Sequence, residues 1–380
     1  MKYLSLIVIC FSTLFVEAQS NFQMFASMDG SIHLTQGNTN IWGYGFIGDD
    51  DISLPSPLLR IPKGDEVNIE MTNISGEAHT IHLHGLDVDQ LNDGVPQTSF
   101  YVFPDETANY TFNANNEGTY LYHCHVTTTL HLTMGMYGMI VVEAPDNQVY
   151  EGGPVYDSSF EYLMSDLEVA TNSFPLFAFP FHEIKPDYFM VNGDSGYLLS
   201  GLISNAVQMN PGEQVLLRLG SMAYSKIEML FPESFHAVVL MSDGRVLPEE
   251  VPISSLEIYP GERFCVMLNP EPGFPDELEV AYYNMINNEY LSSNYIPVID
   301  LSTSMNDLLD GQAVLYPNPS SDHLYLSEDF EGKIQIINYQ GRVVLESELR
   351  LGMGIDLTNF EAGSYILKAH GLGTFKFIKP

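Results

Sequence analysis

The chain contains few positively charged residues. Its 380 residues include 14 Lys and Arg against 49 Asp and Glu, which gives a formal net charge of -35. A surface this negative repels the phosphate backbone of DNA and RNA, so the composition argues against nucleic acid as a partner. Hydrophobic residues make up 45% of the chain, too large a share for an acidic disordered protein. We expect a folded protein with an acidic surface.

The shortage of positive charge is greatest in the N-terminal half. Residues 19–148 carry 2 basic and 16 acidic residues, and no Lys or Arg lies between Lys63 and Lys185. Such a segment produces a negative field that attracts cations and slows the approach of anions.

Long apolar runs are scarce, and the one at the N-terminus is short. Residues 1–18 combine a positive start at Lys2, an apolar run that ends at Val16 and a small-x-small cleavage site that ends at Ala18. This pattern predicts a signal peptide and export from the cell. No later segment reaches the length of apolar sequence that a membrane span needs, so we predict no membrane span.

Cysteines are scarce as well. Of the 3 cysteines, Cys10 lies in the predicted signal peptide, which leaves Cys124 and Cys265. Two cysteines exclude a disulfide framework of the kind that stabilises small secreted domains.

Helical periodicity is rare, and short runs of alternating or β-branched residues recur between turn signals. The expected strands are 66–72, 80–84, 108–112, 118–123, 138–143, 215–219, 235–241 and 263–268. They predict an all-β fold of antiparallel sandwiches or barrels. Composition shifts divide the mature chain into residues 19–148, residues 149–301, a linker at 302–312 and residues 313–380.

Histidines and a cysteine gather in two motifs of the first part. These are His79-Thr-Ile-His82-Leu-His84-Gly85 and Tyr122-His123-Cys124-His125, with His131 and Met136 downstream. Successive side chains of a strand point to opposite faces. His82 and His84 therefore share a face and His79 takes the other, and His123 and His125 point away from Cys124. The motifs predict an inner set that begins with His79 and Cys124, and an outer set of four histidines.

The inner set, completed by His131 and Met136, offers two imidazoles, a thiolate and a thioether. This is the donor set of a blue-copper site, which shuttles between Cu(I) and Cu(II) with little change of geometry. The outer set contains imidazoles alone, which suits copper centres that bind oxygen species. Because Cys124 lies between His123 and His125, the backbone would join the two sets by a short covalent route.

These motifs resemble those of the multicopper oxidase family, which is built from cupredoxin domains. The resemblance implies two cupredoxin-like Greek-key β-sandwich domains, at 19–148 and 149–301. It also implies that the inner set binds type 1 copper and that the outer set belongs to the type 2/type 3 cluster, which reduces dioxygen. Asp93 stands where the family has an acid that could relay protons; as an Asp before Gly94, it is alternatively a turn former.

The chain departs from the family in its number of histidines. The family cluster is held by eight histidines from two domains, whereas this chain offers four in His-x-His pairs, and its second domain contains only His182 and His236. Two alternatives follow: a homo-oligomer shares histidines between subunits, or the site holds fewer coppers. Nitrite reductases of related fold carry an aspartate at the position of His82, so this residue argues against that function.

The last 67 or so residues resemble a different family. The segment Tyr316-Pro-Asn-Pro and the closing Lys379 are similar to the C-terminal sorting domain of type IX secretion in Bacteroidetes. The resemblance implies a small β-sandwich domain at 313–380, partnership with the type IX machinery, and a secreted or cell-surface location.

The sequence therefore predicts a laccase-like multicopper oxidase that takes electrons from a small-molecule or metal-ion donor and passes them to dioxygen. Two alternatives stay open. One is a copper-binding or electron-transfer protein without turnover, and the other is an adhesion module that binds no copper.

Overall fold

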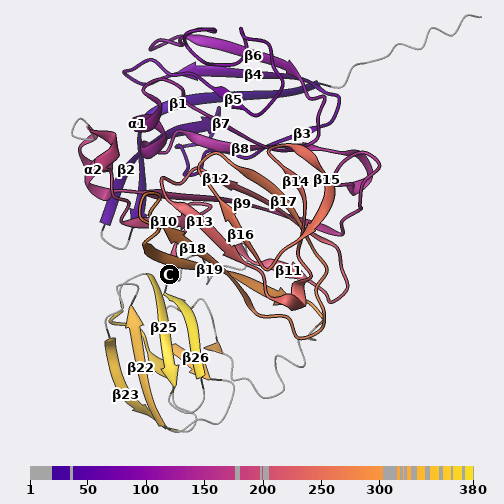
Figure 1. Ribbon diagram of the computed structural model, residues 1–380. Coiled ribbons are helices and arrows are strands. Elements are labelled where there is room, and N and C mark those ends of the chain that lie inside the picture. Colours follow the sequence, from indigo (N-terminus) through magenta and orange to yellow (C-terminus); the bar gives the residue numbers. More distant parts are fainter. Residues whose placement is uncertain are drawn as a thin grey trace, which may run out of the picture.

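Figure 1 shows the computed structural model, in which β-strands form most of the regular structure. The structure describes residues 19–34, 37–175, 180–196, 199, 205–302, 315–316, 320, 323–326, 332–338, 343–350, 354–360, 363–369 and 373–379. The predicted signal peptide and residues 303–312 of the predicted linker lie outside the described residues. The all-β fold class is confirmed. Within the described part of the chain, no helix is long and apolar enough to cross a membrane.

The first β-sandwich consists of two four-stranded sheets, with strand orders β2-β1-β4-β6 and β3-β8-β7-β5. Its strands are β1 (Gln19–Leu34), β2 (Gly37–Phe46), β3 (Leu59–Pro62), β4 (Glu66–Asn73), β5 (His82–His84), β6 (Thr107–Asn113), β7 (Gly118–His123) and β8 (Tyr137–Glu143). Burial alternates along β4, so Val67, Ile69 and Met71 face inward. They share one core with Tyr120 and Tyr122 of the facing sheet.

The second β-sandwich has a six-stranded sheet, β10-β9-β12-β17-β14-β15, and a five-stranded sheet, β11-β19-β18-β13-β16. Its strands are β9 (Ser158–Leu167), β10 (Tyr188–Val191), β11 (Val207–Met209), β12 (Val215–Ser221), β13 (Lys226–Leu230), β14 (Val238–Ser242), β15 (Arg245–Pro252), β16 (Ser255–Ile258), β17 (Arg263–Leu268), β18 (Glu277–Tyr283) and β19 (Tyr290–Asp300). Val215, Leu217 and Leu219 of β12 pack in the same core as Val280 and Tyr282 of β18.

The C-terminal unit forms a three-stranded sheet, β20-β21-β24, and a four-stranded sheet, β23-β22-β25-β26. Its strands are β20 (Leu315–Tyr316), β21 (His323–Leu326), β22 (Gly332–Asn338), β23 (Val343–Leu349), β24 (Ile355–Asp356), β25 (Gly363–Ala369) and β26 (Gly373–Lys379). The unit has a core of its own, which includes Leu324, Ile334, Ile336 and Phe377.

The first and second sandwiches share an apolar interface. Leu121 and Met139 of the first sandwich belong to one buried cluster with Leu163, Leu167 and Met190 of the second. Strand β7 contacts both β12 and β17. The strand that ends at His123 is therefore held against the second sandwich.

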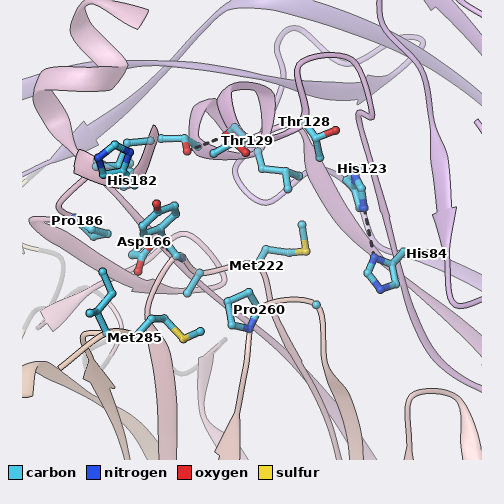
Figure 2. A pocket seen from close by; sticks show the side chains of 18 residues that line it. His84, His123, Thr128, Thr129, Asp166, His182, Pro186, Met222, Pro260 and Met285 are labelled. Carbon is cyan, nitrogen blue, oxygen red and sulfur yellow. Dashed lines mark hydrogen bonds between the residues drawn. The ribbon is translucent and has the colours of Figure 1, made fainter. Parts of the chain in front are cut away.

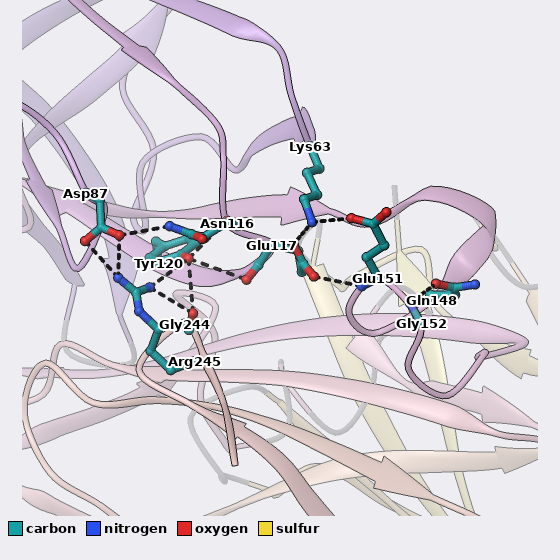
Figure 3. A network of polar contacts seen from close by, with 10 residues as sticks. All are labelled: Lys63, Asp87, Asn116, Glu117, Tyr120, Gln148, Glu151, Gly152, Gly244 and Arg245. Atoms are coloured by element: carbon teal, nitrogen blue, oxygen red, sulfur yellow. Dashed lines mark hydrogen bonds and ion pairs between the residues drawn. The ribbon is translucent and has the colours of Figure 1, made fainter. Parts of the chain in front are cut away.

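A polar network continues this interface at its edge (Figure 3). Arg245 of the second sandwich forms an ion pair with Asp87 of the first, at 2.8 Å. The Tyr120 hydroxyl donates to the Gly244 carbonyl at 3.2 Å and accepts a hydrogen bond from Arg245 at 3.3 Å. These contacts tie the loop after β5 to the start of β15.

Two expected strands are shorter than the sequence indicated. The strand expected at 80–84 begins at His82, because the Thr80 carbonyl accepts from the Tyr44 hydroxyl and the Ile81 N–H donates to the Tyr110 hydroxyl. These backbone groups are therefore bonded to side chains instead of a neighbouring strand. The strand expected at 235–241 begins at Val238, because a 3₁₀ turn ends there with His236 at a φ of 44°.

Candidate metal centres

The inner set lies in the core of the first sandwich. Cys124 follows β7, His79 forms an isolated bridge with Val102, and His131 lies in the short helix α1 (Thr128–Met134). Cys124 Sγ lies 3.1 Å from His131 Nδ1 and 3.7 Å from His79 Nδ1. The side chains of His79, Cys124 and His131 are at most 1% exposed. The structure thus brings these three residues together in a buried group.

Helix α1 explains how His131 reaches Cys124 across seven residues. Thr127 precedes the helix at a φ of 43°, and Gly135 ends it at a φ of 113°, a left-handed conformation that glycine adopts without strain. Met136 follows at once and is buried in the same core. Its carbonyl accepts a hydrogen bond from the Cys124 N–H at 3.1 Å, so its backbone lies beside the cysteine.

Burial sets the protonation of the inner set. It lowers the pKa of His79 to about 3, with a further contribution from His131, and lowers the pKa of His131 to about 4. Both imidazoles are therefore neutral at pH 7 and keep a lone pair for a metal. Burial also raises the pKa of the Cys124 thiol, so a thiolate here needs a cation beside it. A buried thiolate with two neutral imidazoles fits copper.

The outer set forms a second cluster on the opposite side of the same segment. The His82 ring lies 5.8 Å from that of His84, 5.0 Å from that of His123 and 5.2 Å from that of His125, measured between centroids. His84 Nδ1 and His123 Nε2 approach to 3.3 Å. His82, His84 and His123 each present a ligand atom within 4.8 Å of the others. Burial lowers the pKa of His123 to about 3 and that of His84 to about 4, so both rings are neutral at pH 7.

Two backbone carbonyls orient these rings. His82 Nδ1 donates to the carbonyl of Asp93 at 2.7 Å, and His123 Nδ1 donates to the carbonyl of Cys124 at 3.0 Å. Each bond fixes the proton on Nδ1 and leaves the Nε2 lone pair for a metal. The Asp93 carboxylate lies 3.4 Å from His82 Nδ1, so the acid singled out from the sequence lies beside the outer set.

Two outer imidazoles face a cavity between the first and second sandwiches. The cavity, of about 540 Å³, has His84 and His123 in its wall (Figure 2). The second sandwich contributes Met222 and His182, and the buried carboxyl of Asp166, to the same cavity. His84 and His123 therefore face the second sandwich of their own chain.

The second sandwich brings no histidine pair to the outer set. His182 lines the cavity, whereas His236 forms an ion pair with Glu271 at 2.9 Å and does not line it. Side chains that approach the histidine motifs but were missed from the sequence include Glu77, which lies 3.7 Å from His131, and Arg263, which packs over Gly85. Both stand outside the histidine motifs, so no local pattern could have indicated them.

Two families of known proteins match parts of the chain. The sequence profile of a multicopper oxidase family matches residues 46–147. Residues 46–147 form a multicopper oxidase domain. This copper oxidase domain includes both histidine sets, and the cofactor that its family implies is copper. The profile of a secretion system C-terminal sorting domain matches residues 314–379, which indicates secretion or export to the cell surface.

The copper oxidase domain also has curated relatives. The chain is 36% identical to copper resistance protein A of Escherichia coli over 114 residues, which are 30% of this chain and 18% of that protein. It is 26% identical to a copper-containing nitrite reductase of Neisseria meningitidis over 215 residues, or 53% of this chain and 51% of that protein. The chain therefore spans about half of the length of one of these relatives and less than a fifth of the other.

A solved structure shares the fold. The multicopper oxidase mgLAC aligns with a TM-score of 0.60 at 24% identity, over 74% of this chain and 86% of that chain. At this identity the likeness extends to the cupredoxin-like fold alone.

We expect the Cys124→Ser variant to abolish the blue colour of the copper-loaded protein and any oxidase activity, because the thiolate gives the intense visible band. Cys265→Ser is the matched control, since Cys265 is also buried but lies 3.3 Å from the Thr119 hydroxyl, away from both histidine sets. Visible spectra and circular dichroism test this. Stoichiometric copper binding without an intense thiolate band in the unmutated protein would contradict the type 1 assignment.

The metal-free protein should lose stability as the pH falls from about 6.5 toward 4. The pKa values of His79 and His123 are about 3 and those of His84 and His131 about 4, against an ordinary 6.5. Between about pH 6.5 and 4 the unfolded chain therefore binds more protons than the folded protein, so a fall in pH favours unfolding. Burial raises the pKa of Asp166 to about 6, so this carboxyl group alone would stabilise the protein as the pH falls. We expect the four histidines to outweigh it. Thermal unfolding at several pH values measures the slope, and His123→Gln should make it shallower. Equal slopes in both proteins would argue against this origin.

Proposed function

We propose that the protein is an exported copper oxidase that takes single electrons from a small donor at the inner set and delivers them to dioxygen at the outer set. One observation carries the proposal: the segment His123-Cys124-His125 places a buried Cys-His-His group on one side and four clustered imidazoles on the other. Copper bound at these sets supplies the one-electron redox chemistry. Together, His79, Cys124, His131 and Met136 would hold type 1 copper, and His82, His84, His123 and His125 would hold copper of type 2/type 3 character.

Within the chain, Cys124 connects the two sets. Its peptide bonds lead directly to His123 and His125, and the hydrogen bond from His123 Nδ1 to the Cys124 carbonyl adds a second link. An electron that arrives at the inner set thus has a route of a few covalent bonds to the outer set. Asp93, beside His82, would hold and release protons there, because dioxygen reduction consumes them.

The electron donor would dock where His131 approaches the surface. His131 Nε2 points toward the Glu77 carboxylate at 3.7 Å, and the Glu77 side chain is 55% exposed. A donor that contacts Glu77 is therefore separated from the inner set by one imidazole ring. With the acidic surface of residues 19–148, this carboxylate favours cationic donors such as amines or reduced metal ions.

The remaining cluster ligands would come from a second chain. His82 and His125 do not line the cavity between the sandwiches, so another subunit could approach them without displacing the second sandwich. A homo-oligomer with closed symmetry would then bring its histidines together. A second candidate is an electron-transfer protein with one copper, which the shortage of histidine pairs favours.

Export fits this function. The C-terminal sorting domain supports export through type IX secretion machinery. The signal peptide expected at residues 1–18 would direct the chain across the first membrane that it has to pass. The location would be the cell exterior or cell surface.

The two candidates, a homo-oligomeric oxidase and an electron-transfer protein with one copper (the carrier), differ in mass and metal content. An oxidase should sediment as an oligomer and contain three or four coppers per shared site, because one chain lacks the histidines for a full cluster. Sedimentation and metal analysis of the purified protein measure both. A monomer that reduces dioxygen to water would contradict the oligomer, and one copper per chain would favour the carrier.

We expect Glu77→Gln to lower kcat/KM for a cationic donor by about fivefold at low salt, because a charge pair near 4 Å in water contributes about 1 kcal/mol. The effect should shrink above physiological ionic strength, where the screening length is about 8 Å. Glu66→Gln is the control, since it removes the same charge from an exposed position on β4. Steady-state rates against salt for one cationic and one anionic donor test this. A preference for the anionic donor at low salt would contradict steering by the acidic surface.

A further inference from the structure

Arg263 of the second sandwich reaches the outer histidine set of the first. It is the first residue of β17 and is 4% exposed. Its guanidinium lies over Gly85, the residue that follows His84. A Cβ atom on Gly85 would overlap Arg263 Nη2 and lie 3.2 Å from Cζ, and Gly85 has a φ of 89°. The glycine of the histidine motif therefore makes room for a positive charge from the other sandwich.

Contacts within the second sandwich hold this guanidinium in place. Arg263 Nη1 forms an ion pair with Asp243 at 2.8 Å and donates to the Gly261 carbonyl at 2.6 Å. Gly261 itself packs on the outer set, since a Cβ there would lie 3.1 Å from His84 Cε1. Arg263 Nε is buried and has no acceptor among the described residues. The guanidinium thus retains one buried N–H that lacks a partner there.

The charge of Arg263 acts directly on the outer set. Burial lowers the pKa of His84, and the Arg263 charge lowers it further, whereas Asp243 acts in the opposite direction. The two cationic residues of the first sandwich, Arg60 and Lys63, are each paired with two glutamates. Arg263 is also paired with a carboxylate, that of Asp243, but it differs from them in lying over Gly85, the residue that follows His84.

A guanidinium has no lone pair, so it cannot bind copper, but its planar N–H groups bind small anions well. A buried positive charge also stabilises negative charge more strongly than an exposed one. The acidic surface of residues 19–148 opposes the entry of anions, so a positive charge beside the outer set, in addition to that of the copper, would favour an anion there.

We propose that Arg263 is a positioning residue that holds small anionic ligands, such as oxyanions or azide, at the outer histidine set. This inference rests on the proposed function, because it assumes copper at that set. No bond is made or broken at Arg263; it donates hydrogen bonds and charge to a ligand that the metal site binds.

The test is an azide titration of the copper-loaded full-length protein, followed by electron paramagnetic resonance of the copper that is not blue. Arg263→Gln should weaken azide binding about tenfold or more, the scale of one lost charge-assisted hydrogen bond. Arg263→Lys should recover part of the affinity. Arg245→Gln is the matched control, because it removes an ion pair between the same two sandwiches and should change the affinity less than about threefold.

A second variant, which should strengthen azide binding instead of weakening it, distinguishes a positioning role of Arg263 from a structural one. Asp243→Asn removes the negative charge that partly neutralises Arg263, but its amide oxygen can still accept a hydrogen bond from Nη1 and hold the guanidinium in place. It should therefore tighten azide binding, whereas both variants would weaken it if Arg263 were only structural. Unchanged azide affinity in Arg263→Gln, with the blue band and the copper content retained, would overturn the inference while leaving the oxidase proposal intact. Loss of copper from the outer set in that variant would also overturn it. If Arg263→Gln does not fold, unchanged or weaker binding in Asp243→Asn overturns it. Absence of copper from the outer set of the unmutated protein would overturn both proposals.

Discussion

The inner set and the outer set both depend on the alternation of side chains along one extended segment. Because successive residues of a strand point to opposite faces, Cys124 enters the core while His123 and His125 turn toward the other side. A shift of one residue in the register of β7 would exchange these faces and put the cysteine among the outer imidazoles. The shared core of the two sandwiches, which includes Leu121 of the same strand, fixes that register.

Burial gives the two sets their chemistry. The inner group is closed in by core residues, including Trp42, whose ring meets the His131 ring edge-on at 5.3 Å. Desolvation keeps the imidazoles neutral, which leaves their lone pairs available at pH 7. The same desolvation disfavours a free thiolate at Cys124, so thiolate and copper would stabilise each other there. The outer set is less enclosed, because His84 and His123 line a cavity.

The second sandwich does not supply the histidine pairs that its cupredoxin-like fold would lead one to expect. It contributes no His-x-His pair, yet it forms the far wall of the cavity and brings Gly261 against His84 and Arg263 over Gly85. Under the proposed function, a domain without metal ligands would therefore still influence what reaches the outer set. Its position is set by the apolar interface and by the ion pair of Arg245 with Asp87.

The sequence by itself determined the fold class and the grouping of the donors. Strand periodicity is local, so parity alone could separate His79 and Cys124 from the four outer histidines. The boundaries of β5 and β14 were less well predicted, since the tyrosine hydroxyls that bind Thr80 and Ile81 come from distant strands, and His236 ends a turn. Only the tertiary structure decided which surfaces the outer set faces and which charges lie near it. Glu77 meets His131 and Arg263 meets Gly85 only through folding, and no pattern along the chain encodes a distance between residues that are far apart in sequence.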